Sequence, residues 1–127
     1  MTVAEELKVL LVEDEAITAM VIETQLRKAG YRVAGHATSG EEAVSLAAKQ
    51  VFHVVLMDIR LAGDMDGIEA ARRIAKSRRT PIVFMTGYQD EETRRRAAEL
   101  TPFAYLVKPV SGDDLASLLA GVRRRGV

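Results

Sequence analysis

The sequence predicts an α/β protein in which five parallel strands form one sheet with helices on both faces. Short apolar runs alternate with helical patterns five times along the 127 residues. One run, Val54–Asp58, places four apolar residues before a carboxylate, which is typical of a strand buried on both faces. Four of the runs end on a polar residue, and a parallel sheet would bring those residues to one edge.

A long helix is expected after the first strand, Val9–Val12, with Gly30 as its stop signal. Two apolar sets run along Asp14–Ala29, and we predict that both face the sheet. The first set is Ile17, Met20, Val21 and Thr24, and the second is Ala19, Ile22, Leu26 and Ala29.

Three further helices begin at capping signals, in which a Ser or Asp is followed three residues later by an acidic residue. These signals are Ser39 with Glu42, Asp66 with Glu69, and Ser111 with Asp114. The remaining strands are expected at Arg32–Ala37, Ile82–Met85 and Ala104–Val107.

The helix expected at Asp90–Leu100 differs from the others, because its apolar stripe is narrow. Glu91 with Arg95, and Glu92 with Arg96, have the spacing of ion pairs that contribute a few tenths of a kcal/mol each. This helix should therefore be held on the sheet more weakly than the others.

Composition excludes several classes of protein. There is no cysteine, which removes disulfides and thiolate chemistry, and no apolar run approaches the ~20 residues of a membrane span. The 18 basic and 18 acidic residues cancel, so we expect no direct binding to nucleic acid or membrane. Without the features of a signal peptide at the N-terminus, a cytoplasmic protein is expected. Arginine clusters are interpreted as solvated faces and a helix end; they are Arg72-Arg73, Arg78-Arg79, Arg94-Arg95-Arg96 and Arg123-Arg124-Arg125.

The polar residues at the strand ends form a set with a definite chemistry. Glu13-Asp14 follow the first strand, Asp58 ends the third, Thr86 follows the fourth and Lys108 the fifth. Three converging carboxylates repel one another unless a cation is present, and an all-oxygen ligand set favours Mg²⁺, with Mn²⁺ as the second choice. A lysine and a hydroxyl beside them suit a transferred phosphoryl group. The set therefore points to an aspartyl phosphate.

With these residues in this order, the chain resembles the receiver domain of two-component response regulators over essentially its full length. The resemblance implies a (βα)5 doubly wound sheet with the flavodoxin-like strand order 2-1-3-4-5. It identifies Asp58 as the phosphoacceptor, Lys108 as its catalytic cation, and Thr86 and Tyr105 as switch residues. It also implies a cis bond between Lys108 and Pro109.

The resemblance further implies the metal ligands and two residues that tune hydrolysis. Mg²⁺ would be held by Glu13, Asp14, Asp58 and the backbone carbonyl of Arg60. The side chains of Arg60 and Tyr88 flank the path of the hydrolytic water, and we expect both to slow the loss of the phosphoryl group.

As a function, the resemblance implies a phosphoacceptor switch and not a true enzyme, because the domain catalyses only its own phosphorylation and dephosphorylation. A histidine kinase or phosphotransfer protein would donate to Asp58, and the face made by the fourth helix, fifth strand and fifth helix would contact an unknown output protein. Residues 1–127 are expected to form a single stand-alone domain with no output domain; the alternatives are a phosphorelay intermediate or a fragment of a larger regulator or hybrid kinase.

Three rival functions are disfavoured by the residues. An aspartyl phosphatase commonly has a second aspartate two residues after the nucleophile, where this chain has Arg60. A flavodoxin would need a hydroxyl-rich phosphate loop after the first strand, and an inert binding module would not need the full site. The segment Arg60–Met65 departs from the resemblance, since it is one residue longer than usual and lacks a proline, which leaves its conformation open.

Overall fold

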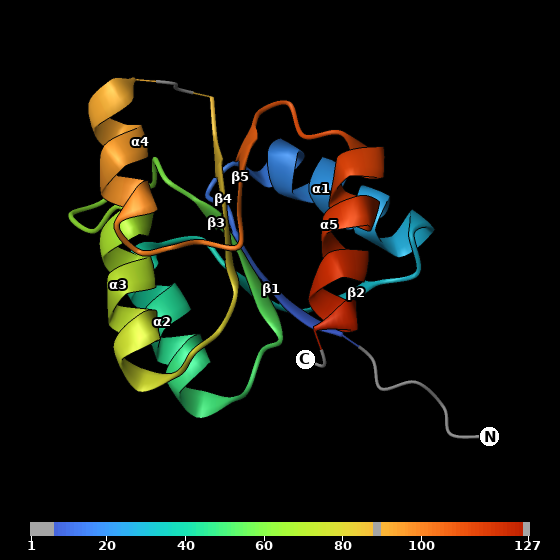
Figure 1. Cartoon of the computed structure of the whole chain (residues 1–127), viewed down its shortest axis with the longest axis horizontal. Coiled ribbons are helices and arrows are strands. Elements are labelled where there is room, and N and C mark those ends of the chain that lie inside the picture. The colour runs from blue at the N-terminus through green and yellow to red at the C-terminus, as the bar shows by residue number, and fades with distance from the viewer. Residues whose placement is uncertain (1–6, 88–89, 126–127) are drawn as a thin grey trace.

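The computed structural model describes residues 7–87 and 90–125, which form one parallel sheet covered by helices (Figure 1). The strands are β1 (Lys8–Val12), β2 (Arg32–Ala37), β3 (Val54–Asp58), β4 (Ile82–Thr86) and β5 (Ala104–Val107). The helices are α1 (Ala16–Lys28), α2 (Gly40–Lys49), α3 (Gly67–Ser77), α4 (Glu91–Ala98) and α5 (Gly112–Arg124). The strand order is β2-β1-β3-β4-β5, as expected from the sequence. None of the described helices has the length and apolar character needed to cross a bilayer.

The sheet separates two apolar cores. Helices α1 and α5 cover one face, and α2, α3 and α4 cover the other (Figure 1). The residues of β3 alternate between the two cores, so that Val55 and Met57 face one and Val54 and Leu56 face the other. All five residues of β3 are buried, which explains why this strand reads as a continuous apolar run in the sequence.

The capping signals mark helix starts as predicted. Ser39, Asp66 and Ser111 each accept a hydrogen bond from the backbone N–H three residues later. Asp90 caps α4 in the same way. Because the crossover helices run antiparallel to the strands, these capped ends lie at the carboxyl edge of the sheet, beside the strand ends that carry Asp58 and Thr86.

Helix α1 departs from the prediction, because only one of its two apolar sets faces the sheet. Ala19, Ile22 and Leu26 are buried. The prediction that the other set is also inward is wrong, since Ile17 is 79% exposed and Met20 65% exposed. A helix on a sheet buries a stripe little wider than 100°, and the two sets together span more than that. Helix α1 therefore presents a row of apolar side chains to the solvent.

Helix α4 has few inward contacts, as its narrow stripe predicts, and Ala97 is its buried residue. Among the residues that the structure describes, neither expected ion pair within α4 forms. Arg96 instead donates to Asp66 Oδ2 at 3.2 Å, across to the capping residue of α3. Arg94 lies over the ring of Tyr105, with its guanidinium carbon 4.9 Å from the ring centroid.

Charge is segregated between the two edges of the sheet. Four helices begin with acidic residues at the carboxyl edge: Glu41 and Glu42 in α2, Glu69 in α3, Glu91 and Glu92 in α4, and Asp113 and Asp114 in α5. All five end with basic residues: Arg27 and Lys28, Lys49, Lys76, Arg95 and Arg96, and Arg123 and Arg124. Each arrangement complements the helix dipole. Apart from Arg96, which reaches the cap Asp66 at the carboxyl edge, the helix ends thus give a chain of zero net charge an acidic edge and a basic edge.

Candidate phosphoacceptor site

Three carboxylates converge at the carboxyl edge of the sheet, as their positions at the strand ends predicted. Glu13 follows β1 and is fully buried, Asp14 is partly buried, and Asp58 ends β3 with 4% of its surface exposed. One oxygen from each lies within 4.8 Å of the others. The three side chains therefore form a single cluster of oxygen ligands.

Lys108 reaches this cluster from the end of β5. Its Nζ donates to Glu13 Oε1 at 2.6 Å and lies 3.2 Å from Asp58 Oδ2. Its backbone N–H donates to the carbonyl of Thr86 at 2.8 Å, and the peptide bond to Pro109 is cis, as expected. Burial acts to lower the pKa of the Lys108 ammonium, but the hydrogen bond to Glu13 and the charge of Asp58 outweigh burial and raise it. The lysine is therefore a fixed positive charge.

One lysine does not balance three carboxylates. Burial, followed by the charge of Glu13, raises the pKa of Asp58 to about 7, even though Lys108 acts in the opposite direction. A divalent cation would remove this excess of negative charge. Glu13, Asp14 and Asp58 supply only hard oxygen ligands, which fit Mg²⁺ better than a softer metal.

Backbone N–H groups of the loop after β3 also point at the carboxylates. The N–H of Arg60 donates to Asp58 Oδ1 at 3.3 Å, and the N–H of Ala62 donates to Asp14 Oδ2 at 3.0 Å. The lengthened loop therefore closes over the site. Gly63, at φ +96°, takes the backbone conformation that the turn requires.

Gly67 packs directly on the strand that ends at Asp58. A Cβ atom at Gly67 would lie 2.0 Å from the carbonyl oxygen of Asp58, and the Gly67 N–H donates to the carbonyl of Ile59 at 2.8 Å. Only glycine fits there without displacing the backbone of Asp58. The start of α3 is thus positioned against the backbone of Asp58 although the preceding loop is one residue longer.

The two predicted switch residues lie on neighbouring strands. Thr86 is fully buried at the end of β4. Tyr105 pairs in register with Phe84 and packs on the face of the sheet that α4 covers. Tyr88, the other residue expected to tune hydrolysis, lies outside the described residues, while Arg60 is exposed in the loop after β3.

Two features of this region were not found from the sequence. The Arg96–Asp66 ion pair joins residues 30 apart, and the local spacing favoured Glu92 as the partner of Arg96 instead. His36 Nε2 hydrogen-bonds the backbone oxygen of Glu13 at 3.1 Å, which gives this histidine a role in positioning the acidic segment. Neither contact has a signature in sequence spacing.

Comparison with known proteins identifies relatives over most of the chain. Residues 9–120 match the response regulator receiver domain family. The transcriptional regulatory protein PdtaR of Mycobacterium tuberculosis is 42% identical over 85% of this chain. ZraR of Escherichia coli K12 is 35% identical over 91% of it. The chain spans about half the length of PdtaR (52%) and 26% of ZraR.

Two solved structures agree with the fold. The receiver domain of a modulated diguanylate cyclase from Desulfovibrio desulfuricans G20 is 40% identical, with a TM-score of 0.89 over 95% of this chain and 96% of its own. The receiver domain of the sensor histidine kinase PA1611 from Pseudomonas aeruginosa is 33% identical, with a TM-score of 0.79 over 91% of this chain and 95% of its own. In that protein a magnesium ion is coordinated in the active site cleft.

Proposed function

Because the chain belongs to the response regulator receiver family, we propose that Asp58 accepts a phosphoryl group from a histidine kinase or a histidine phosphotransfer protein. The observation that carries the proposal is the position of Lys108, whose Nζ lies 3.2 Å from Asp58 Oδ2 inside a cluster of carboxylates. A structural ion pair would need one carboxylate per lysine. The excess of acids suits a site that binds a metal ion and a phosphoryl group.

In the proposed step, a carboxylate oxygen of Asp58 forms a bond to phosphorus as the bond between phosphorus and the donor's imidazole nitrogen breaks. The electron pair of the broken bond stays on the imidazole. Glu13, Asp14, Asp58 and the backbone carbonyl of Arg60 would hold Mg²⁺, which neutralises charge on the carboxylate and the phosphoryl oxygens. Lys108 provides a fixed cation for the same oxygens.

The new group would bias the contacts that hold α4. A phosphoryl group adds about −1.5 to −2 charges with strong acceptor oxygens, and we propose that it draws the Thr86 hydroxyl inward and lets Tyr105 follow. Tyr105 carries Arg94 over its ring, and Arg96 pairs with Asp66, so both contacts would change together. The face made by α4, β5 and α5 is thus the proposed output surface for a partner protein.

The output surface predicts where amide exchange changes on activation. With beryllofluoride and Mg²⁺, we expect the largest change in hydrogen–deuterium exchange within residues 86–107, because α4 has the fewest inward contacts to lose. Thr86→Ala should bind the mimic and yet show a smaller change in this segment. Largest changes in α1 and α2 would contradict the proposed output surface.

The exposed row on α1 supports a second part of the proposal, that the phosphodonor protein docks there. The helix begins two residues after Asp14, so its first turns lie beside the carboxylate cluster. Ile17, Met20 and Val21 are each more than half exposed there. A donor must place its phosphohistidine over Asp58, and an apolar row beside the site gives it a surface to bury.

Met20→Asp is therefore expected to slow phosphoryl transfer from the donor protein by about ten-fold or more, since a charge in an apolar contact costs over about 1.4 kcal/mol. The rate with a small phosphodonor should not change. Val51→Asp is the matched control, because Val51 is 49% exposed and follows the C-terminal end of α2. If Met20→Asp lowered the rate of phosphoryl transfer equally with the donor protein and with the small phosphodonor, the defect would lie in the acceptor site instead.

We also propose that Arg60 slows hydrolysis of the phosphoryl group. Its backbone N–H contacts Asp58 and its side chain is exposed beside the site, where it can cover the in-line approach of water. We propose that Tyr88 slows hydrolysis in the same way.

A further inference from the structure

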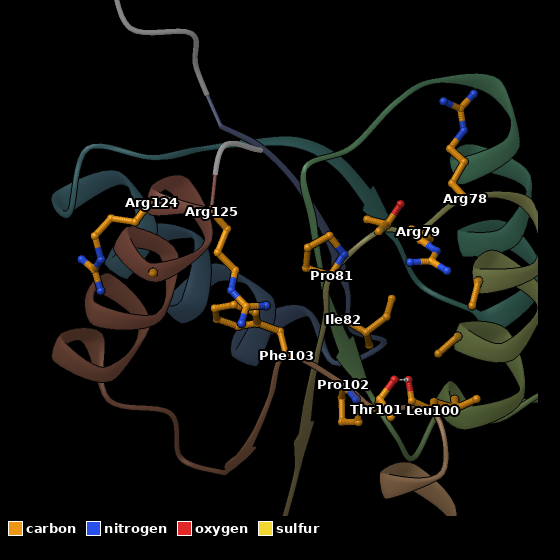
Figure 2. Close-up of a pocket in the computed structure, with 14 residues that line it drawn as sticks. Arg78, Arg79, Pro81, Ile82, Leu100, Thr101, Pro102, Phe103, Arg124 and Arg125 are labelled. Atoms are coloured by element: carbon orange, nitrogen blue, oxygen red, sulfur yellow. Dashed lines mark hydrogen bonds between the residues drawn. The ribbon is translucent and has the colours of Figure 1, made fainter.

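A second site is suggested by a groove at the edge of the sheet opposite Asp58. It has a volume of about 1040 Å³ and spans the amino ends of β4 and β5, between the C-terminal ends of α3 and α5 (Figure 2). We call it the basic groove, and define it by Arg78, Arg79, Pro81, Pro102, Phe103, Arg124 and Arg125. Figure 2 shows Arg78 and Arg79 on one side of Pro81 and the other two arginines on the opposite side.

The charge of the basic groove is unbalanced. Its fourteen lining residues include four arginines and no acidic residue. Within the described part of the chain, none of these four arginines forms an ion pair, whereas Arg72 and Arg73 both pair with Glu69. The groove thus carries positive charge without a carboxylate to balance it, and an anion would supply that balance.

The helix dipoles do not account for all four arginines. Lys76 already lies in the last turn of α3, and Arg123 and Arg124 lie in the last turn of α5. Beyond those turns, Arg78 and Arg125 are the C-terminal capping residues of the two helices. The cations thus extend past the helix ends into a shared groove, where a ligand can reach them.

The floor of the basic groove is apolar and carries an aromatic ring. Phe103 is partly buried, and the Arg125 guanidinium lies over it, 5.4 Å from the ring centroid. Helix α5 comes close to this ring, because a Cβ atom at Gly121 would lie 3.3 Å from it. Pro81 and Pro102 complete the floor. A stacked arginine and ring form a flat surface on which a planar group can pack.

We propose that the basic groove binds a nucleotide with two or more phosphates, the planar base packing on the surface that Phe103 and the stacked Arg125 form, and the phosphates on the other arginines. An inorganic anion would satisfy the charges but leave the apolar floor and most of the volume unused. The volume is that of a pocket for a small organic ligand. Guanidinium groups bind phosphate in a bidentate manner, which suits several phosphates at once.

Titration calorimetry with ADP in EDTA tests the proposal, because the acceptor site cannot bind a phosphate through Mg²⁺ under those conditions. We expect Arg79→Ala with Arg125→Ala to weaken ADP binding by about ten-fold or more, as a charge-assisted phosphate contact and the stacked arginine are both lost. Arg73→Ala with Arg123→Ala is the matched control; it removes the same amount of charge from α3 and α5, the helices that end at the groove, but outside the groove, and should change the affinity by less than about two-fold.

Two further ligands test which class of molecule the basic groove binds. Inorganic pyrophosphate should bind at least about five-fold more weakly than ADP, because it cannot use the ring floor. Equal affinity for pyrophosphate and ADP, or equal weakening in the two double variants, would overturn the proposal. Tighter binding of a single-stranded DNA 12-mer than of ADP, at equal phosphate concentration, would also overturn it in favour of a nucleic-acid surface.

Discussion

Asp58→Asn is expected to abolish phosphoryl incorporation from a small phosphodonor and Mg²⁺. The amide has nearly the shape of the carboxylate but no nucleophilic oxygen anion, so the acceptor is lost while the buried strand end stays filled. Intact mass spectrometry measures the result directly. Asp66→Asn, at a partly buried cap outside the cluster, is the control and should incorporate as much as the wild type does. Phosphoryl uptake by Asp58→Asn would show that another residue is the acceptor.

The same substitution should stabilise the metal-free protein at alkaline pH. The pKa of Asp58 is raised to about 7 in the folded state, above its value of about 3.9 in an unfolded chain. Below the lower pKa both states are protonated and the raised pKa costs nothing. As pH rises through the interval, the unfolded state loses its proton first, so the fold is destabilised increasingly until pH passes the folded pKa.

Urea unfolding in EDTA at pH 5 and pH 8 measures this effect. We expect Asp58→Asn to be more stable than the wild type at pH 8, by on the order of 1–3 kcal/mol, and the difference to shrink at pH 5. Loss of the contact between Asp58 and Lys108 opposes this gain. A variant that is less stable than the wild type at pH 8 would show that this contact outweighs burial and the repulsion from Glu13.

Asp14→Ala is expected to remove Mg²⁺ binding. Asp14 is the most exposed of the three clustered carboxylates and is not paired with Lys108, so its loss removes a metal ligand without stranding a buried cation. We expect the affinity to fall by at least about 10-fold, the scale of losing even an indirect support of a metal site. Asp64→Ala, in the nearby loop, should leave it unchanged. Equal affinities in calorimetry would contradict the assigned ligand set.

The sequence predicts most of this fold because its signals are local. A buried strand needs an unbroken apolar run, and a helix start needs a capping side chain, so Val54–Asp58 and Ser39 are recognised within a few residues. The inward face of α1 could not be chosen this way. Both apolar sets satisfy the helical period, and only the packed sheet decides that Ile22 is buried and Met20 exposed.

The candidate site is likewise predictable where its signals are local and hidden where they depend on packing. Its side chains stand at the ends of apolar strands, and the parallel topology brings those ends together, so the cluster is predictable once the strands are recognised. The pairing of Arg96 with Asp66 cannot be predicted from the sequence, because the nearer Glu92 fits the local spacing equally well. The basic groove is also hidden, since residues 78–82, 100–103 and 124–125 meet only in three dimensions.

The segregation of charge between the helix ends gives the neutral chain an electric dipole moment along the strand direction. A charged partner therefore exerts a torque on the molecule before contact and turns one edge toward itself. The proposed phosphorylation would add negative charge at the edge that is already acidic, so it would increase this dipole moment as well as change the net charge. Salt at about 0.1 M screens electrostatic interactions beyond about 10 Å. Raising the salt concentration should therefore slow such encounters, even though the unphosphorylated protein carries no net charge at neutral pH.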